Sequence, residues 1–165
     1  MLLFVFFWYL GFGDSNTKSD VNKAGSYSQL TEWHQFYQSL EETPIHEEAL
    51  QMALRGYQLL MLQGQISDSS RLIIADFSLG SHQERLFIIN VQERVLEYIS
   101  LVSHGKNTGF LKAESFSNEV SSYKSSLGFY LTAETYYGKH GLSLRLDGLE
   151  KGFNDKARER AIVIH

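Results

Sequence analysis

Cysteine is absent from all 165 residues of the chain. Its absence excludes disulfide bonds and thiolate metal sites, and it leaves the chain as given without a thiol nucleophile. Basic residues are also few, with 15 Lys and Arg against 19 Asp and Glu, and they are scattered along the chain. Because a phosphate backbone is bound by clustered cations, we expect no nucleic-acid partner.

Long apolar runs are lacking except at the start. Residues 1–10 (MLLFVFFWYL) are almost wholly apolar, yet a membrane-spanning helix needs about 20 such residues. Small residues follow at Gly11 and Gly13, the spacing that a signal peptidase reads. We therefore predict a secretory signal over residues 1–13 and an exported protein of the periplasm or cell envelope. An uncleaved membrane anchor or a wrongly assigned start codon would also fit.

The remaining length suits a single domain. Residues 14–28 are polar and rich in Ser, Asn, Lys and Gly, which predicts a disordered spacer. Residues 29–165 are then the folded domain. Its first part has helical periodicity, because apolar residues recur at helical spacing over 30–40 and again over 45–61.

Cap and turn residues mark where the second helix begins and ends. Thr43 and Pro44, the one proline of the chain, have the residue types of an N-cap and a first helical position. Gly64 is typical of a helix end. Beyond it, short β-branched and aromatic runs separated by turn residues predict strands. They cover residues 71–77, 85–91, 95–102, 126–131, 142–146 and 161–165, with a long polar loop over 103–123.

Successive strands without intervening helices indicate an antiparallel sheet rather than parallel βαβ units. The predicted fold class is therefore α+β, with N-terminal helices followed by a curled, mostly antiparallel β-sheet. The last predicted strand, 161–165, is apolar and ends in His165. A histidine on a rigid element at the edge of a fold is positioned as catalytic histidines often are.

Other kinds of site find weaker support. The stretch 105–109 (GKNTG) is not a phosphate loop, because Lys106 is followed by Asn, so no nucleotide is expected. The histidines follow no zinc signature, so no metal or other cofactor is expected. Acidic turn residues are more typical of turns than of a glycosidase pair, and the serines lack a nucleophile elbow. The residues weighed as metal ligands are His104, His140, His165 and Asp147. The residues weighed as a glycosidase pair are Asp147, Glu150 and Asp155, and those weighed as a serine nucleophile are Ser115, Ser117 and Ser126.

Several longer stretches carry a family resemblance. They are SLGFYLT at 126–132, GKHG at 138–141, SLRLDGLE at 143–150 and the terminal Ile164-His165. Together they resemble the catalytic domain of YkuD-type murein L,D-transpeptidases, over most of the chain after Ile45. Ser125-Ser126 stands where the family pattern has Thr-Pro.

The resemblance implies an L,D-transpeptidase-like β-sandwich or barrel and an exported enzyme that remodels peptidoglycan. In that family a cysteine thiolate attacks a stem tetrapeptide, forms a thioester and passes the acyl group to an amine of another stem, with a histidine as base. His165 matches the catalytic histidine. Tyr130, His140 and Arg145 are the cleft residues expected to bind the peptide, with Arg145 facing a carboxylate.

One departure from the family is severe. The family holds its nucleophile in a Ser-x-Gly-Cys segment beyond this histidine, and the chain contains no cysteine. We therefore expect a domain that is truncated at its C-terminus and inactive as given, and reading the codons after His165 tests this. The alternative is a non-catalytic module that binds the cell envelope or peptidoglycan. The sequence specifies neither the donor and acceptor stems nor the oligomeric state.

Overall fold

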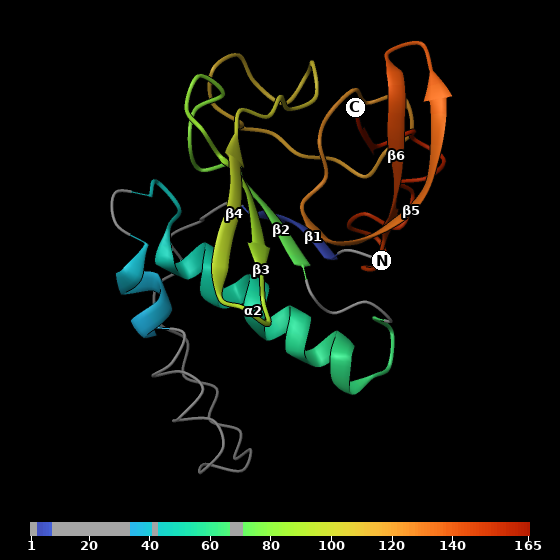
Figure 1. The fold of residues 1–165 in the computed structure, drawn as a ribbon. Coiled ribbons are helices and arrows are strands. Elements are labelled where there is room, and N and C mark those ends of the chain that lie inside the picture. Colours follow the sequence, from blue (N-terminus) through green and yellow to red (C-terminus); the bar gives the residue numbers. More distant parts are fainter. Residues whose placement is uncertain (1–2, 8–33, 41–42, 67–70) are drawn as a thin grey trace, which may run out of the picture.

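From residue 34 on, the described elements follow the predicted order, with helices first and then successive strands and a long loop. A computed structural model describes residues 3–7, 34–40, 43–66 and 71–165 (Figure 1). Residues 34–39 are helical, as the spacing over 30–40 predicts. In the described residues no helix is both long and apolar enough to cross a membrane. The named elements are β1 (Leu3–Phe7), α2 (Glu47–Leu62), β2 (Arg71–Asp76), β3 (Leu86–Asn90), β4 (Val95–Ser100), β5 (Gly128–Gly138), β6 (Gly141–Gly148) and β7 (Val163–Ile164).

Strand β1 connects the two halves of the sheet. The strand order is β4-β3-β2-β1-β5-β6-β7. β1 runs parallel to β2 and antiparallel to β5, and all other neighbouring pairs are antiparallel. It therefore lies between two antiparallel three-stranded units. A mostly β fold with some helix is confirmed, but the described strands do not close into a barrel, and the family's sandwich stays a prediction.

Residues 3–7 belong to the segment predicted as a secretory signal over 1–13. The structure pairs them as the central strand, with Val5 opposite Ile74 on one side and Phe129 on the other. A short apolar run is typical of a signal and also of a buried strand, and periodicity does not separate the two. The signal and the export stay predictions, and the predicted spacer at 14–28 lies outside the described residues.

Helix α2 begins later than the sequence predicts. Thr43 and Pro44 lie outside the helix, and the N-cap is His46 in an extended conformation. The predicted cap at Thr43 was wrong because the sheet fixes the helix start: His46 Nδ1 lies 2.6 Å from Oδ2 of the buried Asp76. The predicted end is confirmed, since Gly64 follows the helix with a φ of 66°.

The sheet is buried on both faces at β2. Side chains alternate along a strand, so Leu72 and Ile74 face one way while Ile73 and Ala75 face the other. The first pair packs in a core cluster with helix α2, and the second packs with residues of β5, β6 and the loop after β4. Burial on two sides explains why β2 reads as a continuous apolar run rather than as an alternating one.

Candidate functional site

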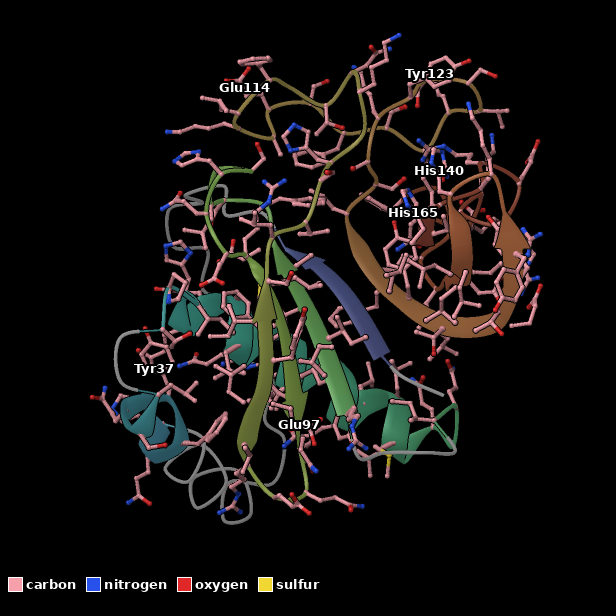
Figure 2. All side chains as sticks on the ribbon, turned by 45° about the horizontal axis from the view of Figure 1, so that its top comes forward. Tyr37, Glu97, Glu114, Tyr123, His140 and His165 are labelled. Atoms are coloured by element: carbon pink, nitrogen blue, oxygen red, sulfur yellow. The ribbon has the colours of Figure 1, made fainter. Side chains whose placement is uncertain are left out.

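Two imidazoles meet at the end of the unit formed by β5, β6 and β7. β5 and β6 form a hairpin whose turn holds His140, and β7 pairs with β6 just before His165. The two rings stack with their centroids 4.6 Å apart and their planes 19° apart (Figure 2). The structure thus brings together two predicted site residues that lie far apart in the sequence.

Arg145 lies on the same face of this unit as His165. It pairs with Val163 across the sheet, and Val163 and His165 share a face because side chains alternate. Its Nε atom is 3.2 Å from Oε1 of Glu134, and its guanidinium carbon is 4.3 Å from the centre of the Tyr136 ring. Any anion that binds Arg145 therefore competes with Glu134.

A second arginine shares Glu134. Arg158 donates to both carboxylate oxygens of Asp147 at 2.6 and 2.7 Å, and to Glu134 at 2.7 Å. Hydrogen bonds from Arg158 hold the pKa of Glu134 below its usual value, and those with Asp147 and Glu134 raise the pKa of Arg158. The imidazole pair is therefore accompanied by a charge-balanced network of two arginines and two carboxylates.

Arg158→Gln should make the protein less sensitive to acid. A carboxyl whose pKa is lowered in the folded state contributes stability above its unfolded pKa, here 4.5 for Glu134, and loses it as the pH falls through the lowered value. The melting temperature of the parent should therefore fall more steeply than that of the variant between about pH 5 and pH 3. Lys151→Gln, an exposed charge in a turn, is the control. Parallel pH profiles for all three proteins would contradict the network's role.

Tyr130 is in the core rather than in a cleft. It has no exposed surface, and its hydroxyl donates to the backbone oxygen of Ser126 at 2.9 Å. Burial raises the pKa of Tyr130 above its usual value. Its predicted contact with a peptide does not fit this position, because the hydroxyl is already bonded inside the protein.

His104 is separate from the imidazole pair. Its Nδ1 accepts from Nη2 of Arg85 at 2.9 Å, so its Nε2 donates to the carbonyl oxygen of Gly109 at 3.1 Å. No three His, Cys, Asp or Glu side chains group as a metal site within the described residues. Of the residues weighed as metal ligands, His140 and His165 stack on each other, whereas His104 bonds to Arg85 and Asp147 bonds to Arg158.

The carboxylates and serines weighed for hydrolysis also have structural partners. Glu150 accepts the backbone N–H of Phe129 at 2.8 Å, and Asp155 accepts from the side-chain amide of Asn118 at 2.7 Å. Ser126 donates its hydroxyl to the carbonyl oxygen of Ser117 at 2.9 Å. These contacts hold turns and loops in place, which agrees with the interpretation of the acidic residues as turn formers, and Ser126 is buried.

One polar cluster was not predicted from the sequence. Where α2 meets β2, the Ser78 hydroxyl donates to Oδ1 of Asp76 at 2.5 Å and also lies 3.0 Å from Nδ1 of His46. Asp76 contacts the same imidazole nitrogen, whereas a catalytic triad uses both nitrogens, so the cluster is a helix anchor and not a triad. A buried aspartate at the end of an apolar run is the signal that marks it.

The structure shows a small, mostly β domain that carries an imidazole pair and an arginine–carboxylate network. The chain contains no thiol. The family model of the L,D-transpeptidase catalytic domain (YkuD_2) matches residues 41–165, and the chain belongs to this family. The family predicted from the sequence is thereby confirmed. No curated protein and no solved structure gave a significant match.

Proposed function

We propose that the chain belongs to an exported protein that remodels peptidoglycan, and that residues 1–165 bind stem peptides without turning them over. The family match over residues 41–165 carries the proposal. The exposed imidazole of His165, which directly follows β7, supports a catalytic-base position. The absence of cysteine supports the lack of turnover.

The proposed reaction begins with a proton transfer. A thiol gives its proton to an imidazole, and the thiolate attacks the scissile carbonyl carbon. The bond to the D-residue then breaks to give a thioester, and the imidazolium returns the proton to the leaving amine. The amine of a second stem then attacks the thioester and releases the thiol. The imidazole of His165 is suited to the first step, because histidine is the side chain that most often acts as general base.

The thiol for this reaction has to come from outside residues 1–165. Loss of a nucleophile lowered turnover by on the order of 10⁶-fold in a measured protease, and neither imidazole replaces it. The second candidate function follows from this absence: a non-catalytic module that binds peptidoglycan through its exposed polar face. The partly exposed ion pair between Arg145 and Glu134 favours it, because a stem-peptide carboxylate can take the place of Glu134.

Binding and turnover are tested on the same sample. The chain should co-sediment with purified sacculi, and its intact mass should show no acyl adduct afterwards. Arg145→Gln should weaken retention by severalfold, whereas Arg71→Gln, which removes another partly exposed arginine from β2, should not. An absence of retention would reject both candidate functions, and an acyl adduct would reject the lack of turnover.

The product of the complete natural reading frame separates the two candidates. If it carries a thiol and is an L,D-transpeptidase, tetrapeptide stems should leave a tripeptide acyl adduct on it. His165→Ala should then prevent the adduct while leaving retention on sacculi intact. Retention without any adduct identifies the binding module.

A further inference from the structure

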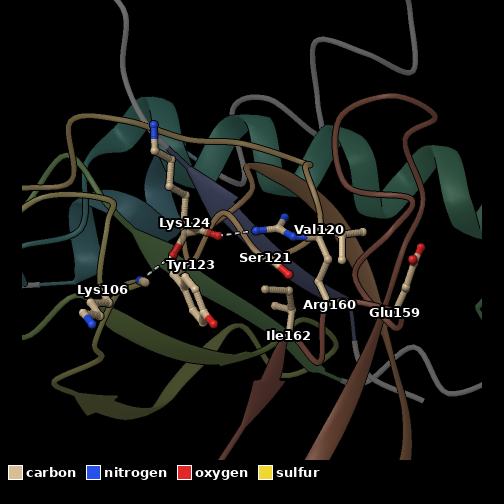
Figure 3. Close-up of a pocket in the computed structure, with 10 residues that line it drawn as sticks. Lys106, Val120, Ser121, Tyr123, Lys124, Glu159, Arg160 and Ile162 are labelled. Atoms are coloured by element: carbon tan, nitrogen blue, oxygen red, sulfur yellow. Dashed lines mark hydrogen bonds between the residues drawn. The ribbon is translucent and has the colours of Figure 1, made fainter.

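A hollow of about 330 Å³ lies beside the segment that leads into β7. Three stretches of chain converge on it, residues 105–106, 120–125 and 159–162 (Figure 3). Neither imidazole lines it. An extended chain advances about 3.5 Å per residue, so Ile162, which lines the hollow, lies within about 10 Å of His165.

The guanidinium of Arg160 forms part of the hollow and is held in one orientation. Its two terminal nitrogens donate to Ser117 O at 2.6 Å, to the Ser126 hydroxyl, to Ser122 Oγ at 3.1 Å and to Lys124 O at 2.5 Å. All four acceptors are neutral. Burial lowers the pKa of Arg160, because it partly removes the guanidinium from water.

One N–H of Arg160 remains open. In the described part of the chain no acceptor contacts its Nε, and the one enclosed side-chain polar atom without a partner there is Oγ1 of Thr43. The Nε–H of Arg160 is therefore accessible to solvent. A cation fixed by four bonds with a fifth donor exposed is prepared to bind an anion without further ordering.

Most of the charged residues that line the hollow are basic, like Arg160. Lys106, Lys124 and Arg160 line it, while Glu159 is its one carboxylate and lies on the side opposite Lys106 (Figure 3). The ammonium of Lys124 points away from the hollow and donates to Ser115 Oγ at 2.6 Å, so the positive charge at the hollow comes from Lys106 and Arg160. No ion pair joins any of these four to another described residue. A net positive hollow in a chain of net charge −4 attracts anions to this point.

Backbone strain gathers at the same place. Ser121, Tyr123 and Ala161 have positive φ angles of 62°, 54° and 54°, and Arg94 is the one other non-glycine residue with a positive φ in the described chain. Gly105 permits the close approach, because a Cβ there would lie 2.7 Å from the carbonyl oxygen of Tyr123. Strained conformations persist where the surroundings enforce them, and they concentrate at ligand sites.

We propose that this hollow is a carboxylate-binding subsite for the peptide, in which Arg160 contacts the carboxylate and apolar walls receive a small side chain beside it. Val120 and Tyr123, which are 46% and 68% exposed, supply apolar surface for that side chain. Arg160 offers one open N–H, and the carboxylate of Glu159 at the rim repels further negative charge. The hollow therefore suits a ligand with a single negative charge rather than a phosphate dianion. The identity of the ligand as a stem peptide rests on the proposed function; the preference for a carboxylate does not.

The test compares a carboxylate with its uncharged analogue. N-acetyl-D-alanine should shift the NMR signals of residues 120–125 and of the Arg160 Nε–H in the full chain, and N-acetyl-D-alaninamide should not. Val120→Asp should weaken binding at least tenfold through repulsion at an exposed wall position, while Val120→Thr, which adds no charge, should weaken it much less. Lys106→Met should weaken it about threefold, as expected for an exposed charge, and Lys151→Met should have no effect.

The results separate the carboxylate subsite from the proposed function. Equal shifts with acid and amide, or undiminished binding to Val120→Asp, would overturn the carboxylate subsite. If sacculi are retained and the acid fails to bind, the subsite is wrong and the proposed function stands. If the acid binds and sacculi are not retained, the hollow is a carboxylate site and the proposed function is wrong.

Discussion

Arg85→Met should lower the free energy of unfolding by about 3–5 kcal/mol, because it removes a buried donor that bonds to two carbonyl oxygens and to His104, and each partner left unsatisfied costs about 1–3 kcal/mol. Arg85 is fully buried, and so is Asp76, whose negative charge acts on it. The guanidinium donates to the carbonyl oxygen of Val102 at 2.8 and 3.0 Å, and to that of Leu79 at 2.9 Å. Methionine fills a similar space but leaves the two carbonyl oxygens without their donor, and it removes the positive charge that acts on Asp76.

The loss should extend to the long loop after β4. Nη2 of Arg85 donates to His104, and His104 in turn holds the carbonyl oxygen of Gly109, so the arginine fixes both the tautomer and the loop. Burial lowers the pKa of Arg85 to about 10, which leaves it charged at neutral pH. The variant should therefore lose protection from hydrogen exchange in residues 103–110 before it unfolds globally.

Arg71→Met is the matched control. Arg71 lies in the same unit, at the start of β2, and forms a partly exposed pair with Glu97 at 2.8 and 3.0 Å. Exposed pairs contribute less than about 1 kcal/mol, so the control should differ little from the parent in urea unfolding followed by circular dichroism. Equal losses for the two variants would show that Arg85 is not an anchor.

The strands could be predicted because each carries its own local signal. Runs at 85–91 and 95–102 flank a turn, and the structure pairs them as β3 and β4. The loop at 103–123 was recognised from its polar composition, and the described structure has no helix or strand there. The alternation of apolar and polar residues and the residue types of turns are local patterns, so they can be recognised from the sequence alone.

The site could not be predicted in the same way because it depends on pairing register. Phe129 and Tyr130 are adjacent and similar, yet they pack in core clusters on opposite sides of the sheet, so nothing local marks Tyr130 as inaccessible. The stacking of His140 on His165 requires β7 to pair with β6. The role of Arg85 depends on carbonyl oxygens that the fold alone brings to it.

Val5→Pro should separate the two antiparallel units of the sheet. Val5 is paired with Ile74 of β2 and with Phe129 of β5, and β1 is the one strand between the units. Proline has no backbone N–H and is not tolerated in a central strand. Each ladder acceptor left without a donor costs about 1–3 kcal/mol, and the amides of β2 and β5 that face β1 should exchange faster.

Val5→Ile keeps the β-branched side chain and the backbone donor, so its exchange pattern should match that of the parent. The comparison also bears on the predicted signal over residues 1–13. A segment that a signal peptidase removes cannot be required by the mature fold, so unchanged protection of β2 and β5 in Val5→Pro would show that the sheet does not depend on β1 and would favour the signal. Loss of protection would instead mean that removing residues 1–13 exposes the facing edges of β2 and β5, and unpaired strand edges invite association with other strands.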